Sequence, residues 1–127
     1  MINTEAMFPV MVIPSLESVK AFYETIFGFE SVFYDPNFYL HLALPTTGVQ
    51  LGFLLENHHS QPDFLNPTMS TDGYVISLEV KEANQAYLEA KSLNLTIVMP
   101  LKEEEWVQIH FIIQDPSGIH IDIVQHL

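Results

Sequence analysis

Apolar and polar residues follow one another along the chain in a pattern that predicts one strand, one helix and three more strands. Residues 7–13, MFPVMVI, form a short apolar run that is typical of a buried strand. In residues 16–27 the apolar side chains recur at spacings of three and four, which predicts an amphipathic helix. Ser15 can cap the start of this helix, and Gly28 can end it in the left-handed conformation. The three strands are expected at residues 30–35, 38–44 and 49–55.

The same order of elements returns in the second half of the chain. A strand is expected at residues 74–80 and an amphipathic helix at residues 82–93. Asn94 then takes the place of Gly28, 66 residues later, because asparagine also tolerates the left-handed conformation. The last three strands are expected at residues 95–100, 106–114 and 119–125. The acidic stretch KEEE at residues 102–105 is interpreted as a solvated turn.

The repeated pattern predicts the fold class. The length of 127 residues indicates a single domain, 1–127. We expect a first βαβββ unit at residues 7–55, a polar linker loop at 56–72 and a second unit at 74–125. The prediction is an α+β protein whose two βαβββ units form a curved mixed sheet around a cleft.

Composition and charge narrow the range of partners. Sixteen acidic residues oppose four basic ones, which gives a formal net charge of −12. Nucleic acid and membrane surfaces are therefore not expected as partners, because binding to them requires clustered lysine and arginine. The charge favours a cationic ligand, or serves solubility alone. The sequence contains no cysteine and shows no signal peptide at its start, so we expect a cytoplasmic protein without disulfides.

The strongest candidates for a functional site lie near the C-terminus. Trp106, Gln108 and His110 alternate on one face of a predicted strand, and His120 and Asp122 share one face of the next. Two histidines and one carboxylate can bind a metal such as non-heme iron. A histidine beside a carboxylate can also act as a general acid or base. With the tryptophan, the same residues can instead line a pocket for an organic ligand.

Two segments resemble a known protein family. The stretch FYETIFGFE at residues 22–30 and the closing QDPSGIHIDIVQ at residues 114–125 are similar to the vicinal oxygen chelate superfamily, which contains glyoxalases, extradiol dioxygenases and bleomycin-resistance proteins. The pattern is most similar to bleomycin-resistance proteins, which often carry Pro-Trp-Gly before the turn Asp-Pro-x-Gly. Here Trp106 lies between Glu105 and Val107. The resemblance implies the glyoxalase/bleomycin-resistance fold and a homodimer.

The resemblance also implies where metal ligands would lie. The position of the first-strand ligand is Phe8, that of the fifth-strand ligand is Tyr74 or Val75, and that of the last-strand ligand is Asp122. Phenylalanine and valine cannot bind a metal, so we expect no metal and no cofactor.

These observations lead to one hypothesis and one alternative. We expect a metal-free protein that binds a small organic molecule. Its model is the sequestration of a cationic aromatic drug by bleomycin-resistance proteins. The alternative is a divergent metal-dependent lyase, isomerase or dioxygenase with the metal on Asp122 and His110 or His120. A regulatory or structural domain is a third option. The predicted ligand-binding residues are Phe8, Phe38, His41, Trp106, Gln108, His110, His120 and Asp122.

Overall fold

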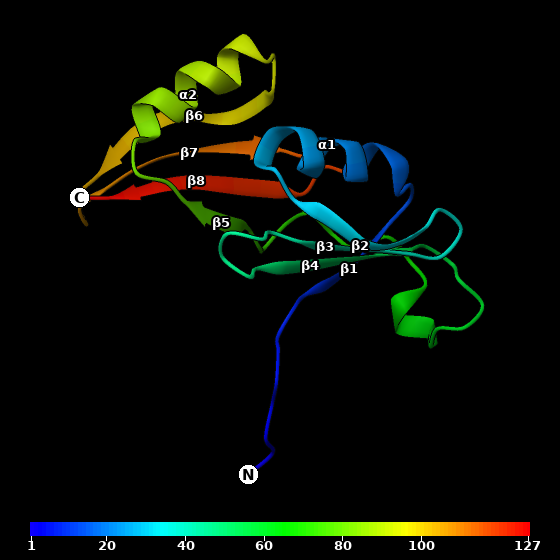
Figure 1. Ribbon diagram of the computed structural model, residues 1–127. Helices are drawn as coiled ribbons and strands as arrows, with labels where there is room; N and C mark the ends of the chain where they lie inside the picture. The colour runs from blue at the N-terminus through cyan, green and yellow to red at the C-terminus, as the bar shows by residue number, and fades with distance from the viewer. The chain divides into compact units, whose positions relative to one another are not determined.

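The chain folds into two units that repeat the same order of elements. The computed structural model describes residues 1–127, and it divides them into a first unit, Met1–Met69, and a second unit, Ser70–Leu127. Each unit contains one four-stranded mixed sheet and one α-helix, in the order βαβββ (Figure 1). The predicted α+β class with two βαβββ units is therefore confirmed, and hydrogen bonding gives each unit a sheet of its own.

The first unit places its first strand beside its last. The sheet order is β1-β4-β3-β2, with β1 and β4 parallel and the other pairs antiparallel. This order lets α1 connect β1 to β2 across one face of the sheet. The elements are β1 (Val10–Ile13), α1 (Glu17–Phe27), β2 (Glu30–Asp35), β3 (Tyr39–Ala43) and β4 (Gln50–Leu55).

The second unit has the same topology. Its sheet order is β5-β8-β7-β6, again with a parallel pair between the first and the last strand. Helix α2 contacts β6, β7 and β8 (Figure 1). The elements are β5 (Ile76–Glu79), α2 (Ala83–Ser92), β6 (Thr96–Glu104), β7 (Gln108–Gln114) and β8 (His120–His126).

Strand alternation gives each sheet a helix-covered face and an open face. In the second unit Phe111 packs against Tyr87 of α2, with 5.1 Å between ring centroids, and is buried with its same-face neighbours Ile113, Ile121 and Ile123. In the first unit Phe53 packs against Tyr23 of α1 in the same way. Successive side chains of a strand point to opposite faces, so the intervening residues of β3, β4, β7 and β8 lie on the open faces. These open faces carry most of the predicted site residues.

The helix ends agree with the predictions in part. Gly28 and Asn94 both adopt positive φ angles, 75° and 55°, and end α1 and α2 as predicted. The prediction that Ser15 caps α1 was wrong. Leu16 occupies the N-cap position, and no side chain caps the helix there. The buried Leu16 side chain anchors this end of the helix in the core instead.

Several strand boundaries differ from the predicted ones. Phe8 and Phe38 precede β1 and β3 rather than lying within them. Trp106 lies in the turn between β6 and β7, so the strand predicted from residue 106 begins at Gln108. The acidic stretch predicted as a turn instead extends β6 as far as Glu104. The apolar pair at 106 and 107 continues the strand pattern, but the chain reverses there, with Val107 at a φ of 64°.

The segment predicted as a linker belongs mostly to the first unit. The backbone N–H of Glu56 donates to the carbonyl of Ile13 (3.0 Å), and that of Met69 donates to the carbonyl of Val12 (2.9 Å). Within this loop the 3₁₀-helix η1 spans Asp63–Leu65. Residues 56–69 therefore form a loop whose two ends are fixed to β1. Separately, the chain has no helix with the length and apolar character needed to cross a membrane.

Candidate functional site

His110 is held between two carboxylates on the open face of the second sheet. Its Nδ1 lies 2.7 Å from Oδ1 of Asp122 on β8, and its Nε2 lies 3.0 Å from Oε2 of Glu104 on β6. The residue is 9% exposed, so the carboxylates replace water as its partners. Of the predicted residues, the structure brings His110 and Asp122 together, and Glu104 joins them.

Both ring nitrogens of His110 face acceptors, which determines its charge. A neutral imidazole has one N–H donor and one lone pair, and the lone pair would oppose a carboxylate. Burial by itself lowers the pKa of His110, but the hydrogen bonds and negative charges of Glu104 and Asp122 outweigh it and raise the pKa. Hydrogen bonds from His110 and Lys102 lower the pKa of Glu104. The cluster therefore favours the protonated form of His110, with one N–H toward each carboxylate.

Two further side chains complete this cluster. Nζ of Lys102 lies 3.0 Å from the second oxygen of Glu104, and the hydroxyl of Ser77 on β5 donates to Asp122 over 3.3 Å. A chain of side-chain contacts on the open face thus links neighbouring strands across the whole sheet. In its protonated form His110 donates one N–H to each carboxylate and keeps no lone pair, so it is a poor general base in this arrangement.

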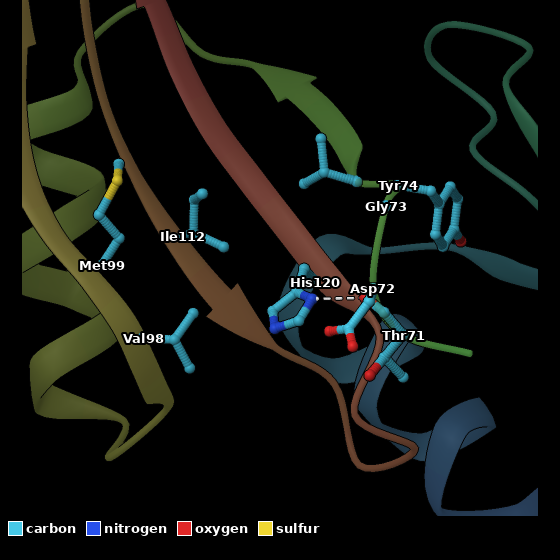
Figure 2. Close-up of a pocket in the computed structure, with 9 residues that line it drawn as sticks. Thr71, Asp72, Gly73, Tyr74, Val98, Met99, Ile112 and His120 are labelled. Carbon is cyan, nitrogen blue, oxygen red and sulfur yellow. Dashed lines mark hydrogen bonds between the residues drawn. The ribbon is translucent and has the colours of Figure 1, made fainter.

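His120 lies apart from that cluster, in a pocket of about 360 Å³ at the start of β5 (Figure 2). Its Nδ1 donates to the backbone carbonyl of Thr71 (2.9 Å), and its Nε2 accepts from the amide of Gln114 (3.1 Å). This pattern corresponds to a neutral imidazole. The pocket is lined by Thr71, Asp72, Gly73, Tyr74, Val75, Val98, Met99, Ile112 and His120.

Trp106 does not line this pocket. Ile112 lies four positions beyond Gln108, which is about 14 Å along a strand, so Trp106 lies at the far end of the hairpin. Its indole is 62% exposed, and its Nε1–H donates to Oε1 of Gln108 (2.7 Å). The structure thus brings Trp106 and Gln108 together as predicted, through a turn rather than along one strand face.

The remaining predicted residues lie in the first unit. His41 accepts from or donates to Tyr39 at Nδ1 (2.7 Å) and contacts Oε1 of Gln50 at Nε2 (2.7 Å). The ring of Phe8 meets that of His41 edge to face, with 4.6 Å between centroids. Phe38 stacks against His58 at 4.6 Å. The eight predicted residues therefore form separate groups within each unit.

Sequence reasoning missed several residues of the side-chain clusters and pockets described above. Glu104 was assigned to a turn, and Tyr39, Gln50 and Asp72 were not singled out. No local signal pointed to Glu104, because residues 102–105 are all charged and show no strand alternation. Tyr39 and Gln50 become visible only when the register pairs β3 with β4.

The comparisons with known proteins identify the family. The family model of the glyoxalase/bleomycin resistance protein/dioxygenase superfamily matches residues 8–123. The chain belongs to this superfamily. No curated protein matches it significantly. The superfamily's fold, expected from the sequence resemblance, is the one observed.

Solved structures of the superfamily's fold superimpose along nearly the whole chain. A superfamily member from Sphaerobacter thermophilus has 23% identity and a TM-score of 0.76, with 98% of both chains covered. A lactoylglutathione lyase from Agrobacterium tumefaciens has 16% identity and a TM-score of 0.77, with 97% of this chain and 94% of that chain covered. TioX from Micromonospora has 15% identity and a TM-score of 0.72, covering 98% of this chain and all of the other. At these identities the likeness concerns the fold alone.

The residues at the superfamily's expected metal positions do not fit a metal. Phe8 and Val75 have no donor atom, and Oδ1 of Asp122 is bound to His110. Burial raises the pKa of Tyr74, the other fifth-strand candidate, to about 12, which disfavours the phenolate that would bind a metal. Both nitrogens of His110 and of His120 already have partners. The side chains form no group of three or more histidine and acidic residues arranged to hold a metal ion.

Proposed function

We propose that this member of the superfamily binds a cationic aromatic small molecule without the help of a metal. The supporting observation is the pocket at the start of β5, which combines an apolar wall with a carboxylate. Val98, Met99 and Ile112 supply the wall, and Asp72 lies at the opposite side near His120 (Figure 2). Such a wall favours a flat apolar ligand, and the carboxylate of Asp72 favours a ligand with a positive charge.

The charges around the pocket support the same ligand class. Asp122, the cross-strand neighbour of Ile112, is already paired with His110, so Asp72 is the acid of this pocket that can meet a cation. Lys102, the basic residue of β6, is paired with Glu104, and His120 is hydrogen-bonded as a neutral ring. The net charge of −12 adds a long-range attraction for cations.

Drug sequestration of the bleomycin-resistance type is the proposed role. It rests on the sequence pattern of residues 8–30 and 103–118, with Trp106 at the position of the tryptophan in that group. A protein that sequesters its ligand needs a Kd between about nanomolar and micromolar, or about 8 to 12 kcal/mol. We further propose that the protein acts as a homodimer, which light scattering coupled to size-exclusion chromatography tests directly.

Isothermal titration calorimetry tests the ligand class. The probes are bleomycin and the cationic dye methylene blue, with the anionic dye fluorescein as the comparison. We expect micromolar or tighter binding of a cationic probe and none of fluorescein. Asp72→Asn is expected to weaken binding about three- to fivefold, as for a partly exposed ion pair. Asp63→Asn, which makes the same charge change in η1 of the first unit, is the matched control. Equal binding of both dye classes, or equal effects of the two variants, would contradict the proposal.

Elemental analysis of tag-free protein tests the metal-dependent alternative. The proposal expects no stoichiometric metal after incubation with iron, manganese, nickel or zinc. About one tightly held metal per chain, lost in Asp122→Asn together with lyase or dioxygenase activity, would favour the alternative enzyme instead.

A further inference from the structure

A second pocket lies in the first unit, where the loop 56–69 meets the open face of the sheet. Its volume is about 300 Å³, which is at the lower end of the range for small-molecule sites. Strands β1, β3 and β4 provide one side, and the loop provides the other. The lining residues are Val10, Phe38, Tyr39, Leu54, Gln61 and Leu65.

Hydrogen bonds hold the loop side of this pocket in place. The loop's two ends are bound to the adjacent carbonyls of Ile13 and Val12, as described above. Inside the loop, the N–H of Asn57 donates to the carbonyl of Asn66 (2.7 Å), and that of Leu65 donates to the carbonyl of Pro62 (2.9 Å). The pocket is therefore preformed, so a ligand need not order the loop when it binds.

The sheet side is fixed by a glycine. The hydroxyl end of Tyr39 lies so close to the Cα of Gly52 that a Cβ there would clash with the hydroxyl oxygen. Val10, another lining residue, lies 3.1 Å from the same point. The hydroxyl is also bound to His41, which in turn is bound to Gln50. The Tyr39 ring is thus a rigid wall.

The side-chain amide of Gln61 is the polar group that this pocket offers to a ligand. The Nδ1 atom of His58 accepts the backbone N–H of Ser60 (3.2 Å), so the Ser60 hydroxyl, 2.7 Å away, must donate to it as well. The Ser60 oxygen then accepts from Nε2 of Gln61 (3.1 Å). This chain of bonds fixes the orientation of the Gln61 amide and leaves its Oε1 as an acceptor. No lining side chain carries a charge.

We propose that this pocket is a second binding site, for a small neutral aromatic molecule with one N–H or O–H donor, such as an indole or a phenol. The aromatic walls Phe38 and Tyr39 match a flat ring, and Oε1 of Gln61 matches the single donor. A charged ligand would have no counter-charge here and would lose its hydration. The site differs in position and in ligand class from the acidic pocket of the second unit.

Ligand-observed NMR titration of the full chain with indole and 1-methylindole tests the proposal. The two probes differ by the N–H donor. We expect indole to bind about five- to tenfold more tightly than 1-methylindole, the effect of one hydrogen bond. In Gln61→Leu, which keeps the size of the side chain, this ratio should fall to about one. Gln85→Leu on α2 is the matched control and should leave the ratio unchanged.

Gly52→Ala is a second, independent variant. The new Cβ must displace Tyr39, so both probes should lose affinity about tenfold or more while circular dichroism remains that of a folded protein. If Gly52→Ala does not fold, the Gln61→Leu ratio alone decides. Equal affinities of the two probes for the wild-type protein, or no binding of either, would overturn the proposal.

Competition separates this site from the proposed function. Saturating methylene blue should leave indole binding unchanged, and Asp72→Asn should not alter it. Displacement of indole by the dye would show a single shared site and would contradict the second one. Loss of dye binding with retained indole binding would refute only the proposed function.

Discussion

At the scale of single residues, Val107 has the least favourable backbone conformation for its side chain. Its φ of 64° is in the left-handed region, where the Cβ of a branched residue crowds the backbone. The hydrogen bond from the N–H of Leu127 to the carbonyl of Val107 (3.0 Å) helps to hold the turn in this form. The resemblance to bleomycin-resistance proteins places a glycine at this position, which has no such cost.

Val107→Gly is expected to stabilise the protein by about 1 kcal/mol. The relief of a left-handed β-branched residue exceeds the added entropy of glycine in the unfolded chain. The side chain is 55% exposed, so little burial is lost. Urea denaturation measures the free energy of unfolding. The control Val32→Gly, an exposed valine of β2 without a positive φ, should destabilise instead. Equal signs for the two variants would contradict the argument.

His110 makes the stability of the protein depend on pH above neutrality. Its folded-state pKa is raised above the ordinary 6.5. Its contribution is therefore complete below that value and is lost as the pH rises through the raised folded pKa. The free energy of unfolding should decrease as the pH rises above about 6.5. Urea denaturation across this range measures it.

The variant His110→Asn identifies the source of that loss. It should be less stable at neutral pH by about 2 kcal/mol, because charged hydrogen bonds are removed from a buried site. It should also lack the loss of stability above pH 6.5 that His110 causes. A wild-type profile that is matched by the variant at every pH would show that His110 carries no such linkage. Glu104 acts at acidic pH and in the opposite direction. Its pKa is lowered in the folded state, so its contribution to the free energy of unfolding is lost as the pH falls and the carboxylate is protonated.

The sequence gives the identity of these residues but not their partners. Alternation predicted which residues share a face, such as Gln108 with His110 and His120 with Asp122, since period two needs no tertiary information. It did not show which face of the sheet the helix covers. That Glu104 is the second partner depends on β6 extending to residue 104 and on its register with β7. Such long-range pairing is not encoded in a local pattern.

At the scale of elements, α2 depends on a strand that is far from it in the sequence. Its N-cap residue Glu82 makes no side-chain cap bond. Instead, Oε1 of Gln125 on β8 accepts the N–H of Ala83 over 2.9 Å. The cap is therefore supplied by the sheet rather than by the residue before the helix. No local rule of helix starts could have predicted it.

Gln125→Ala is expected to cost about 1 kcal/mol of stability, the usual loss when a helix N-cap is removed. Thermal denaturation followed by circular dichroism measures the change. Gln85→Ala, an exposed substitution on α2 itself, is the control and should have little effect. A loss as large in the control as in Gln125→Ala would assign the effect to something other than the cap.

The elements themselves were largely predictable. The two helices were found from their 3.6-residue period, and their ends at Gly28 and Asn94 from the residues that tolerate positive φ. The strand at Trp106 was misplaced because an apolar pair in a turn has the same pattern as the start of a strand. The loop 56–69 was taken as a linker because its polarity does not reveal backbone hydrogen bonds to β1.

At the scale of the whole molecule, the charge predicts how salt should act on ligand binding. The net charge of −12 attracts cations over distances that added salt screens. Raising the sodium chloride concentration from 20 to 200 mM should weaken methylene blue binding about fivefold. Indole binding in the first unit should not change, because neither partner is charged. Calorimetry at both salt concentrations measures the difference, and an equal response of both probes would contradict it.

The order of strands also determines when each unit can fold during synthesis. In both sheets the first strand lies at an edge, and its partner is the last strand of its unit. While the ribosome is still translating a unit, β1 or β5 has no neighbour to pair with. The first sheet is thus completed only when residue 55 has left the exit tunnel, and the second only when β8 has emerged. Each sheet is therefore complete only after its final strand has been synthesised. In an arrested nascent chain that lacks β8, β5 has no strand to pair with.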